Sequence, residues 1–334
     1  MNVRQVVPRD AIPSVDDPTF GEEYVGDPDD EVIVVERAAG DDETDAPPRA
    51  YPVGILNYHE IVNDEFGDPI AVTWCPLCGS AVVYDREVGG RVLEFGVSGK
   101  LADDDLVMYD RETGTEWKQS LGEAIAGELA GESLRVLPSS VTTYRKFRNR
   151  NPEGRVLQRP GGESEASGPG DDPEPIDYDD APYADYFESD GFGLGAHRGS
   201  GGREWAREEL APKAVLLGIE SGGDSLGFPL GRVEAAGGVA QATVGDRRVV
   251  VFATPEGIHA FENPGYEFEP VTETDGADEA DGSDDADGCF RADGARWTGA
   301  TGESDDGREL TRLPAKRLFA FAWQDDHGAD AFWS

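Results

Sequence analysis

The stretch 70–85 constrains the fold of this chain most, because two strand-like segments meet there at a turn that holds two cysteines. Apolar residues alternate with smaller ones over 70–74, and a short apolar run follows the turn at 81–84. This pattern predicts a β-hairpin. Within the turn, Pro76 fixes φ and Gly79 can take a left-handed conformation, so both thiols can point to one side of a tight loop.

Cys75 and Cys78 form a Cys-Pro-x-Cys-Gly sequence, which is typical of the knuckles that bind zinc or iron. A tetrahedral site usually takes four ligands, and the sequence has no second Cys-x-x-Cys pair, so other segments must complete the site. The candidates for the remaining ligands are His59, Glu60, Asp64 and Met108. The expected cofactor is a single transition metal such as zinc. A buried pair of small apolar thiols that packs the turn is an equally good interpretation.

Among the candidate ligands, His59 has the most specific predicted position. We expect it on a strand that pairs beside the central hairpin, because sequential strands are usually neighbours and the turn at 63–68 is short. Its imidazole would then lie about 4 Å from a sulfur of Cys75 or Cys78, as for two groups that share a zinc ion. A register slip of one residue would send the ring to the opposite face. The alternative is a hydrogen-bonded histidine at the edge of the sheet.

A second predicted hairpin carries polar residues that could line a pocket. An Asp-Arg pair and a nearby amide can bind a polar ligand, although an ordinary turn salt bridge explains the pair equally well. The pocket candidates are Asp110, Arg111, Trp117, Gln119 and, in a preceding turn, Ser98. The sequence shows no Gly-rich phosphate loop and no Ser-His-Asp arrangement.

The formal net charge is -40, from 69 acidic and 29 basic residues, and only five of the basic residues are lysines. A carboxylate-rich, lysine-poor surface is typical of proteins from a high-salt cytosol, where screening weakens self-repulsion. It argues against nucleic acid or an anionic membrane as a partner, because both need a cluster of Lys and Arg. The one basic run, 144–150, is short and predicts a solvated helix face.

Cellular location is predicted from what the sequence lacks. The N-terminal residues show no apolar signal segment, and no run of about eighteen apolar residues occurs. We therefore expect a soluble cytoplasmic protein. Three cysteines do not make a disulfide framework, and Cys289, beside an acidic loop, is expected to be a bystander.

The two halves of the sequence repeat one another at spacings near 180 residues, so we predict a duplicated unit. Val215–Glu220 corresponds to Val32–Glu36, and Trp297 corresponds to Trp117. The second copy has Ala253–Gly257 in place of the cysteine turn. We therefore expect the functional site in the first half and a structural role for the second half.

The predicted fold is mainly β: two tandem, duplicated antiparallel units, barrel- or sandwich-like, with few short helices. Between the units, a Gly-, Asp- and Pro-rich stretch cannot form a core of its own. The predicted divisions are an extended arm at 1–30, the first unit at 31–158, a linker or surface wrap at 159–212, and the second unit at 213–334 with a disordered acidic insertion at 272–288.

These residues together resemble the family called domain of unknown function 3179, over most of the chain. The matching segments include Asn57–Asp64, Val72–Ala81, Phe95–Gly99, Val107–Thr113 and Trp117–Gln119. The resemblance implies no established activity, substrate or cofactor. It marks as positions of interest His59, Cys75, Cys78, Asp110, Arg111, Trp117 and Gln119.

Three functional hypotheses follow. The first is a metal- or small-molecule-binding β module with its site around Cys75 and Cys78. The second is a redox enzyme that uses one of these thiols, which requires an exposed thiolate with a lowered pKa. The third is a structural or interaction protein without a site, which is favoured if both sulfurs are buried among apolar groups. Whether the protein is an enzyme is left open by the sequence.

Overall fold

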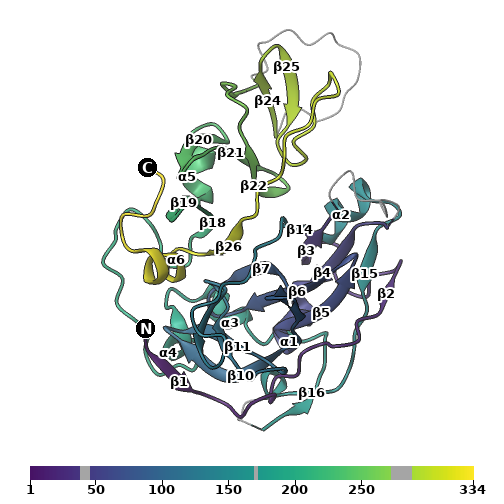
Figure 1. Cartoon of the computed structure of the whole chain (residues 1–334), viewed down its shortest axis with the longest axis vertical. Coiled ribbons are helices and arrows are strands. Elements are labelled where there is room, and N and C mark those ends of the chain that lie inside the picture. Colours follow the sequence, from purple (N-terminus) through teal and green to yellow (C-terminus); the bar gives the residue numbers. More distant parts are fainter. Residues whose placement is uncertain (38–45, 169–171, 272–287) are drawn as a thin grey trace.

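The structure is a computed structural model that describes residues 1–37, 46–168, 172–271 and 288–334 (Figure 1). The predicted acidic insertion, 272–288, lies outside the described residues except for its last position. Strands dominate the described chain, nearly all of them pair antiparallel, and the helices are few and short. The prediction of a mainly β protein is therefore confirmed.

A six-stranded sheet runs through the middle of the molecule in the order β19-β18-β26-β7-β6-β5. Its strands are β5 (Ile61–Phe66), β6 (Asp68–Cys75), β7 (Ser80–Asp85), β18 (Val215–Ser221), β19 (Asp224–Pro229) and β26 (Lys316–Phe319). The predicted hairpin at 70–85 is confirmed, since β6 and β7 pair antiparallel with Cys75 opposite Ser80. The single pair Arg317–Ala81 joins β26 to β7, so this sheet continues from one half of the chain into the other.

Two further sheets complete the first half. One has the order β1-β10-β11-β12-β13, formed by Val3–Gln5, Phe95–Ala102, Asp105–Asp110, Glu116–Lys118 and Glu123–Ala126. The other has the order β14-β3-β4-β15-β2, formed by Ser140–Thr143, Glu31–Val35, Arg49–Pro52, Arg155–Leu157 and Phe20–Gly21. A small separate hairpin joins β8 (Glu87–Val88) and β9 (Arg91–Val92).

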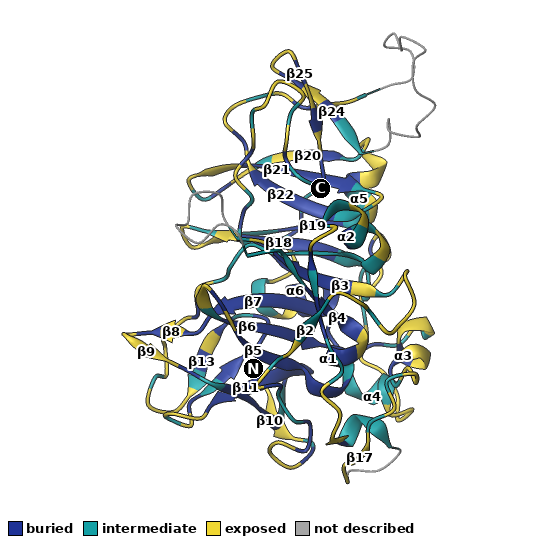
Figure 2. Ribbon diagram, turned by 90° about the vertical axis from the view of Figure 1, so that its right-hand side faces the viewer, coloured by how far each residue is buried: buried dark blue, intermediate teal, exposed yellow. Residues whose placement is uncertain are grey.

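The β6–β7 hairpin is buried on both faces, as the dark strands in Figure 2 show. Side chains alternate between the faces of a strand. Accordingly Val72 and Trp74 join the core that contains Tyr51, whereas Cys75 and Tyr84 join the larger core on the opposite side. This alternation directs the thiol of Cys75 toward the β10–β11 sheet.

The second half repeats the order of elements in the first. In the first half two strands, the helix α1 (Val53–His59) and three strands follow one another; in the second, β18 and β19, α5 (Leu230–Ala235) and three strands do. The latter three strands form a sheet of β20 (Val239–Val244), β21 (Arg247–Thr254) and β22 (Gly257–Glu262). A strand and a helix then close each half: β14 with α2 (Tyr144–Arg150), and β26 with α6 (Ala320–His327). Duplication of the unit itself stays a prediction.

A small three-stranded sheet extends the second half and consists of β23 (Glu269–Pro270), β24 (Cys289–Ala292) and β25 (Ala295–Thr298). No helix in the described ranges has the length and apolar character needed to cross a membrane.

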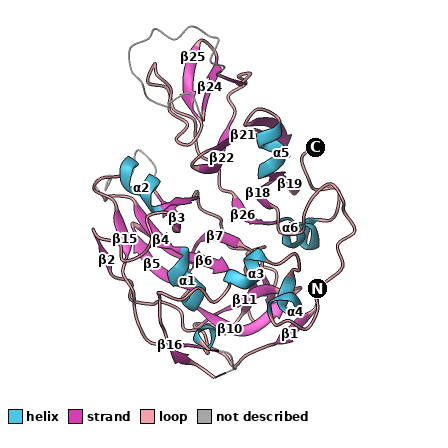
Figure 3. Ribbon diagram, turned by 180° about the vertical axis from the view of Figure 1, so that it is seen from behind, coloured by secondary structure: helices cyan, strands magenta, loops and turns pink. Residues whose placement is uncertain are grey.

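The stretch between the halves packs onto the first half (Figure 3). Its elements are β16 (Glu163–Ser164), the 3₁₀ helix η1 (Glu165–Ser167), β17 (Glu174–Pro175), α3 (Ala184–Glu188) and α4 (Gly193–His197). Tyr183, Tyr186 and Phe192 are buried in the same core as the two cysteines. The hydroxyl of Tyr186 donates a hydrogen bond to the carbonyl of Leu77, 2.6 Å away, so this stretch, called the wrap below (residues 159–212), covers the cysteine turn.

Candidate metal centre

The turn between β6 and β7 holds both thiols inside the protein. Cys75 and Cys78 have exposed fractions of only 2% and 0%. Gly79 takes the left-handed conformation that the sequence predicted, with φ of 55°. A Cβ atom at this position would lie 2.7 Å from the ring of Phe319. The left-handed conformation and the close packing therefore both favour glycine here.

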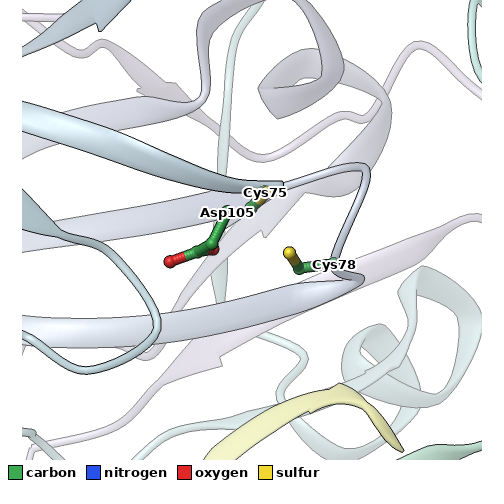
Figure 4. Close-up of side chains that lie close together, drawn as sticks. All are labelled: Cys75, Cys78 and Asp105. Atoms are coloured by element: carbon green, nitrogen blue, oxygen red, sulfur yellow. The ribbon is translucent and has the colours of Figure 1, made fainter. Parts of the chain in front are cut away.

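A third group reaches the thiols from the β10–β11 hairpin. Asp103 and Asp104, at the tip of this hairpin, both have positive φ, 55° and 70°, as the two central residues of a type I′ turn do. Asp105 follows them as the first residue of β11. One carboxylate oxygen of Asp105 and the two sulfurs all lie within 4.8 Å of one another (Figure 4). The Cys78 thiol also donates to the carbonyl oxygen of Asp104 at 3.4 Å.

The Asp105 carboxylate is only half satisfied. Its Oδ2 accepts a hydrogen bond from the backbone N–H of Ser120 at 2.8 Å. Its Oδ1 is buried and has no hydrogen-bond partner within the described part of the chain. A buried carboxylate oxygen without a partner is unusual, because its desolvation is not compensated. The carboxyl group that carries this oxygen lies beside the two sulfurs, where a metal ligand would lie.

Burial shapes the protonation of the three groups. It raises the pKa of the thiols of Cys75 and Cys78, and it raises the pKa of Asp105 to about 6 although the ammonium group of Lys118 acts in the opposite direction. Without a cation the two thiols therefore stay protonated at neutral pH, and burial also disfavours the charged form of Asp105. A bound metal ion would stabilise the charged forms and release the thiol protons.

An ion pair between the two halves of the chain lies beside the centre. Lys118 on β12 contacts Asp326 on α6, and both side chains are almost completely buried. Burial by itself lowers the pKa of Lys118, but the carboxylates of Asp326 and Asp105 outweigh it and raise the pKa above its usual value. Asp326 also accepts a hydrogen bond from the hydroxyl of Ser120 at 2.6 Å. The helix α6 is thereby tied to the strand next to the thiols.

Sequence reasoning missed Asp105 and Asp326. Asp105 ends a run of three aspartates, and such a run at a hairpin is usually a solvated turn. One signal in the sequence could have identified Asp105: it directly follows two turn aspartates and begins an apolar strand. Asp326 lies 208 residues from Lys118 and offers no local signal.

His59 is placed differently from the expectation. It is the last residue of helix α1, so its assignment to a strand was wrong; the strand that pairs beside β6 begins at Ile61. Its Nδ1 lies 2.8 Å from the carbonyl oxygen of Pro13, and its Nε2 lies 2.6 Å from the hydroxyl of Tyr178. The ring therefore ties the N-terminal arm and the wrap to α1, and it is not part of the group of Cys75, Cys78 and Asp105.

Glu60, by contrast, lies near the thiols. It ends α1 with a φ of 57°, a conformation that residues other than glycine rarely adopt. Its buried side chain lines a cavity together with Cys75. Burial, and then the carboxylates of Glu165 and Asp105, raise the pKa of Glu60 to about 8.

Two of the five pocket candidates contact one another inside the β10–β11 sheet. The indole N–H of Trp117 donates to Oδ2 of Asp110 at 3.0 Å, and the backbone N–H of Thr113 donates to Oδ1 at 2.6 Å. These hydrogen bonds hold the turn after β11. Arg111 points outward and pairs with Asp16 and Glu94, 3.1 and 2.9 Å away.

The other two pocket candidates bind backbone and hydroxyl groups. The amide of Gln119 donates to the hydroxyl of Thr73 at 2.8 Å and to the carbonyl of Ser80 at 3.3 Å, so it braces the cysteine hairpin. Ser98 donates to the carbonyl of Val107 at an irregularity in β10. None of the five lines the described cavity beside Cys75.

Of the two remaining ligand candidates, Asp64 is engaged elsewhere, whereas Met108 lies in the same core as the two cysteines. Asp64 binds the guanidinium of Arg49 at 2.6 Å and the hydroxyl of Tyr51 at 2.5 Å. Met108 is fully buried opposite Trp117.

Fold and site together define a class: a β-sheet protein in which a buried Cys-x-x-Cys turn and one aspartate form a group that could hold a metal ion. The chain belongs to the family described as "Protein of unknown function (DUF3179)", whose model matches residues 9–330. The resemblance noted in the sequence is thus confirmed over nearly the whole chain. No curated protein and no solved structure matched the sequence in the same comparisons.

The burial of Glu60 predicts a particular pH dependence of stability in metal-free protein. Its pKa rises from 4.5 in the unfolded chain to about 8 in the folded protein, so between these values the folded state holds a proton that the unfolded chain releases. The free energy of unfolding should therefore fall as the pH rises through this window, by up to roughly 1.4 kcal/mol per pH unit from this group.

Denaturant unfolding at pH 5, 6, 7 and 8 measures this slope. In Glu60→Gln the slope should become shallower across the whole window. Asp105→Asn is the comparison: it should change the slope mainly between 3.8 and about 6, and it should also lower the upper end of the Glu60 window, because the Asp105 carboxylate helps to raise the pKa of Glu60. An unchanged slope in Glu60→Gln would contradict the prediction.

Proposed function

We propose that this protein binds one divalent transition metal ion of the zinc class through Cys75, Cys78 and Asp105. The observation that carries the proposal is the Asp105 carboxyl, which offers one oxygen that lies with the two sulfurs inside 4.8 Å and has a buried Oδ1 atom without a partner among the described residues. A cation between these atoms would compensate the desolvation of the carboxylate. It would also stabilise the two thiolates that burial otherwise disfavours.

The ligand set suits zinc. Two thiolates and one carboxylate are ligands that zinc accepts, with Zn–S distances of about 2.3 Å and Zn–O distances of about 2.0–2.2 Å. Thiolates select against magnesium and calcium, which prefer sites made of oxygen atoms. Three protein ligands leave a fourth tetrahedral position, the arrangement of sites that keep one position for water or a ligand.

Burial of the sulfurs counts against the thiol-based redox enzyme. A redox-active cysteine needs an accessible thiolate with a lowered pKa. Both thiols are instead buried, and burial raises their pKa. The third hypothesis, a protein without a site, requires apolar surroundings for both sulfurs. Apolar side chains do surround both sulfurs. That hypothesis does not explain why the Asp105 carboxyl lies beside them.

The proposal is tested by elemental analysis of protein purified without a chelating column. We expect about one zinc-class ion per chain in the wild type, and loss of this ion in Cys78→Ser and in Asp105→Asn. Cys289→Ser is the matched control, because this cysteine lies on β24 outside the group and its substitution should leave the metal content unchanged. A metal-free wild-type protein that also fails to take up added zinc would refute the proposal.

The surface charge supports a small partner rather than a nucleic acid. With a net charge of -40, the chain repels phosphate backbones and anionic membranes. The one basic run forms α2, where Arg150 pairs with Glu256 and Arg145 pairs with Asp29. This pairing leaves little of its charge available to a polyanion.

A further inference from the structure

A cavity lies directly beside the candidate metal centre, between the cysteine turn, β10 and the wrap. Its volume of about 70 Å³ is several times the roughly 10–15 Å³ that one water molecule needs. Half of its lining residues are aliphatic, and these include Val7, Leu101, Leu106 and Leu194. The cavity therefore suits a molecule of a few heavy atoms with an apolar body.

The charged groups of the wall are already paired, with one exception. Lys100 binds Glu116 at 2.6 Å, and Arg198 lies 3.6 Å from Glu165. The Glu60 carboxyl makes no hydrogen bond to any residue that the structure describes, although it is buried. Among the described residues it is thus the charged group of this wall that lacks a partner, and Tyr183 and His197 also line the cavity.

The backbone holds Glu60 in this position at an energetic cost. A positive φ strains a residue other than glycine, and such strain is concentrated at functional sites. Two hydrogen bonds fix the residue: its N–H donates to the carbonyl of Leu56 at 2.7 Å, and its carbonyl accepts from the N–H of Trp74 at 2.8 Å. The second of these bonds ties Glu60 to the residue that precedes Cys75.

We propose that this cavity binds a small, uncharged aliphatic molecule carrying one primary amide or hydroxyl group, and that the Glu60 carboxyl recognises that group. An anionic ligand would find no free counter-charge, because the cations in the wall are already paired. A cationic ligand is disfavoured as well, because burial raises the pKa of Glu60 to about 8 and keeps its carboxyl uncharged at neutral pH. An amide or hydroxyl both donates and accepts, so it can pair with the single unpartnered carboxyl. The aliphatic body would pack against the leucine and valine side chains.

This inference goes beyond the metal centre and does not depend on it. Cys75 lines the cavity, so a bound molecule would lie next to a metal held by that residue. Recognition by Glu60 nevertheless requires no metal. The two proposals can therefore fail separately.

Isobutyramide is a suitable probe, and its binding to the full chain can be followed by ligand-observed NMR. We expect saturable binding with a Kd of roughly 1 mM, which is attainable for so small a ligand. Binding should persist after treatment with a chelator. Isobutyrate and isobutylamine, which have the same aliphatic body but carry a charge, should bind at least about tenfold more weakly.

Three variants locate the site. Glu60→Leu should weaken isobutyramide binding about tenfold or more, whereas Glu60→Gln, which keeps a donor and an acceptor, should retain most of it. Leu194→Trp should fill the cavity and abolish binding. Circular dichroism of each variant establishes that it is folded, and the comparison of isobutyramide with its two charged analogues decides the matter if the Leu variant does not fold.

Several outcomes would overturn the proposal. These are the absence of saturable binding to the wild type, wild-type affinity in Glu60→Leu, retained binding in a folded Leu194→Trp, and tighter binding of isobutyrate than of isobutyramide. The last result would mean that the cations of the wall select the ligand. Binding that disappears with the metal would assign recognition to the metal centre instead of Glu60.

Discussion

Replacing Lys118 by methionine is expected to lower the free energy of unfolding by about 3–5 kcal/mol, because it leaves a charge buried without its partner. Asp326 has a side-chain exposure of 1%, so water cannot replace the lost ammonium group. The second contact of its carboxylate, with the hydroxyl of Ser120, does not compensate a full charge. Equilibrium unfolding in guanidinium chloride, followed by circular dichroism, measures the change.

Two controls separate this effect from a general loss of charge. The double variant Lys118→Met with Asp326→Leu should recover much of the stability, because apolar residues of similar size often replace a buried ion pair without loss. Arg145→Met breaks the exposed pair with Asp29 and should change stability very little. If Lys118→Met is as mild as Arg145→Met, the pair has no structural role.

Replacing Trp323 by alanine should also cost about 3–5 kcal/mol, the usual range for removal of a large buried aromatic side chain. Its ring is completely buried and lies against β18 and β19, where two glycines make room for it. A Cβ atom at Gly218 would be 2.2 Å from the ring, and one at Gly227 would be 2.6 Å from it. The indole N–H donates to the carbonyl of Ala331 at 2.6 Å.

The same unfolding assay tests this prediction. Trp323→Phe keeps part of the packing and should be less destabilising than the alanine variant. Trp333→Ala is the matched control, because this half-buried ring stacks on Phe228 at the edge of the same sheet and should cost less. Equal losses for Trp323→Ala and Trp333→Ala would show that the glycine-lined position has no special importance.

The central hairpin could be predicted because its signals are local. The alternation over 70–74 and the turn residues Pro76 and Gly79 determine strand, turn and strand within one short segment. The helix that ends at His59 could not be separated from a strand on the same grounds. It has only seven residues, and its buried positions, which include Val53 and Ile55, fit the period of a strand as well as that of a helix.

The metal centre was predictable only in part. The two cysteines lie in one turn, so the sequence places them together. The third group arrives through the pairing of β10 with β11, and the ion pair beside it through a contact between the two halves. Such contacts depend on how sheets pack, which no local pattern encodes.

Amino-acid composition indicated the average character of a segment or surface, but it did not predict which individual residues are buried. The wrap is rich in Gly, Asp and Pro, yet a few aromatic side chains, including Tyr186 and Phe192, are buried in the main core. The low number of lysines indicates a surface poor in that residue. Two of the five lysines, Lys118 and Lys316, are instead buried in ion pairs.

The sheet that crosses between the two halves has a consequence for how the protein is made. Because β26 and α6 come from residues 316–327, the ribosome has synthesised the cysteine turn long before the elements that cover β7 and hold Lys118 emerge. During that interval the thiols are expected to remain accessible to metal ions in solution. In the finished protein, exchange of a bound ion would require local opening of these last elements, so its rate should follow the rate of that opening.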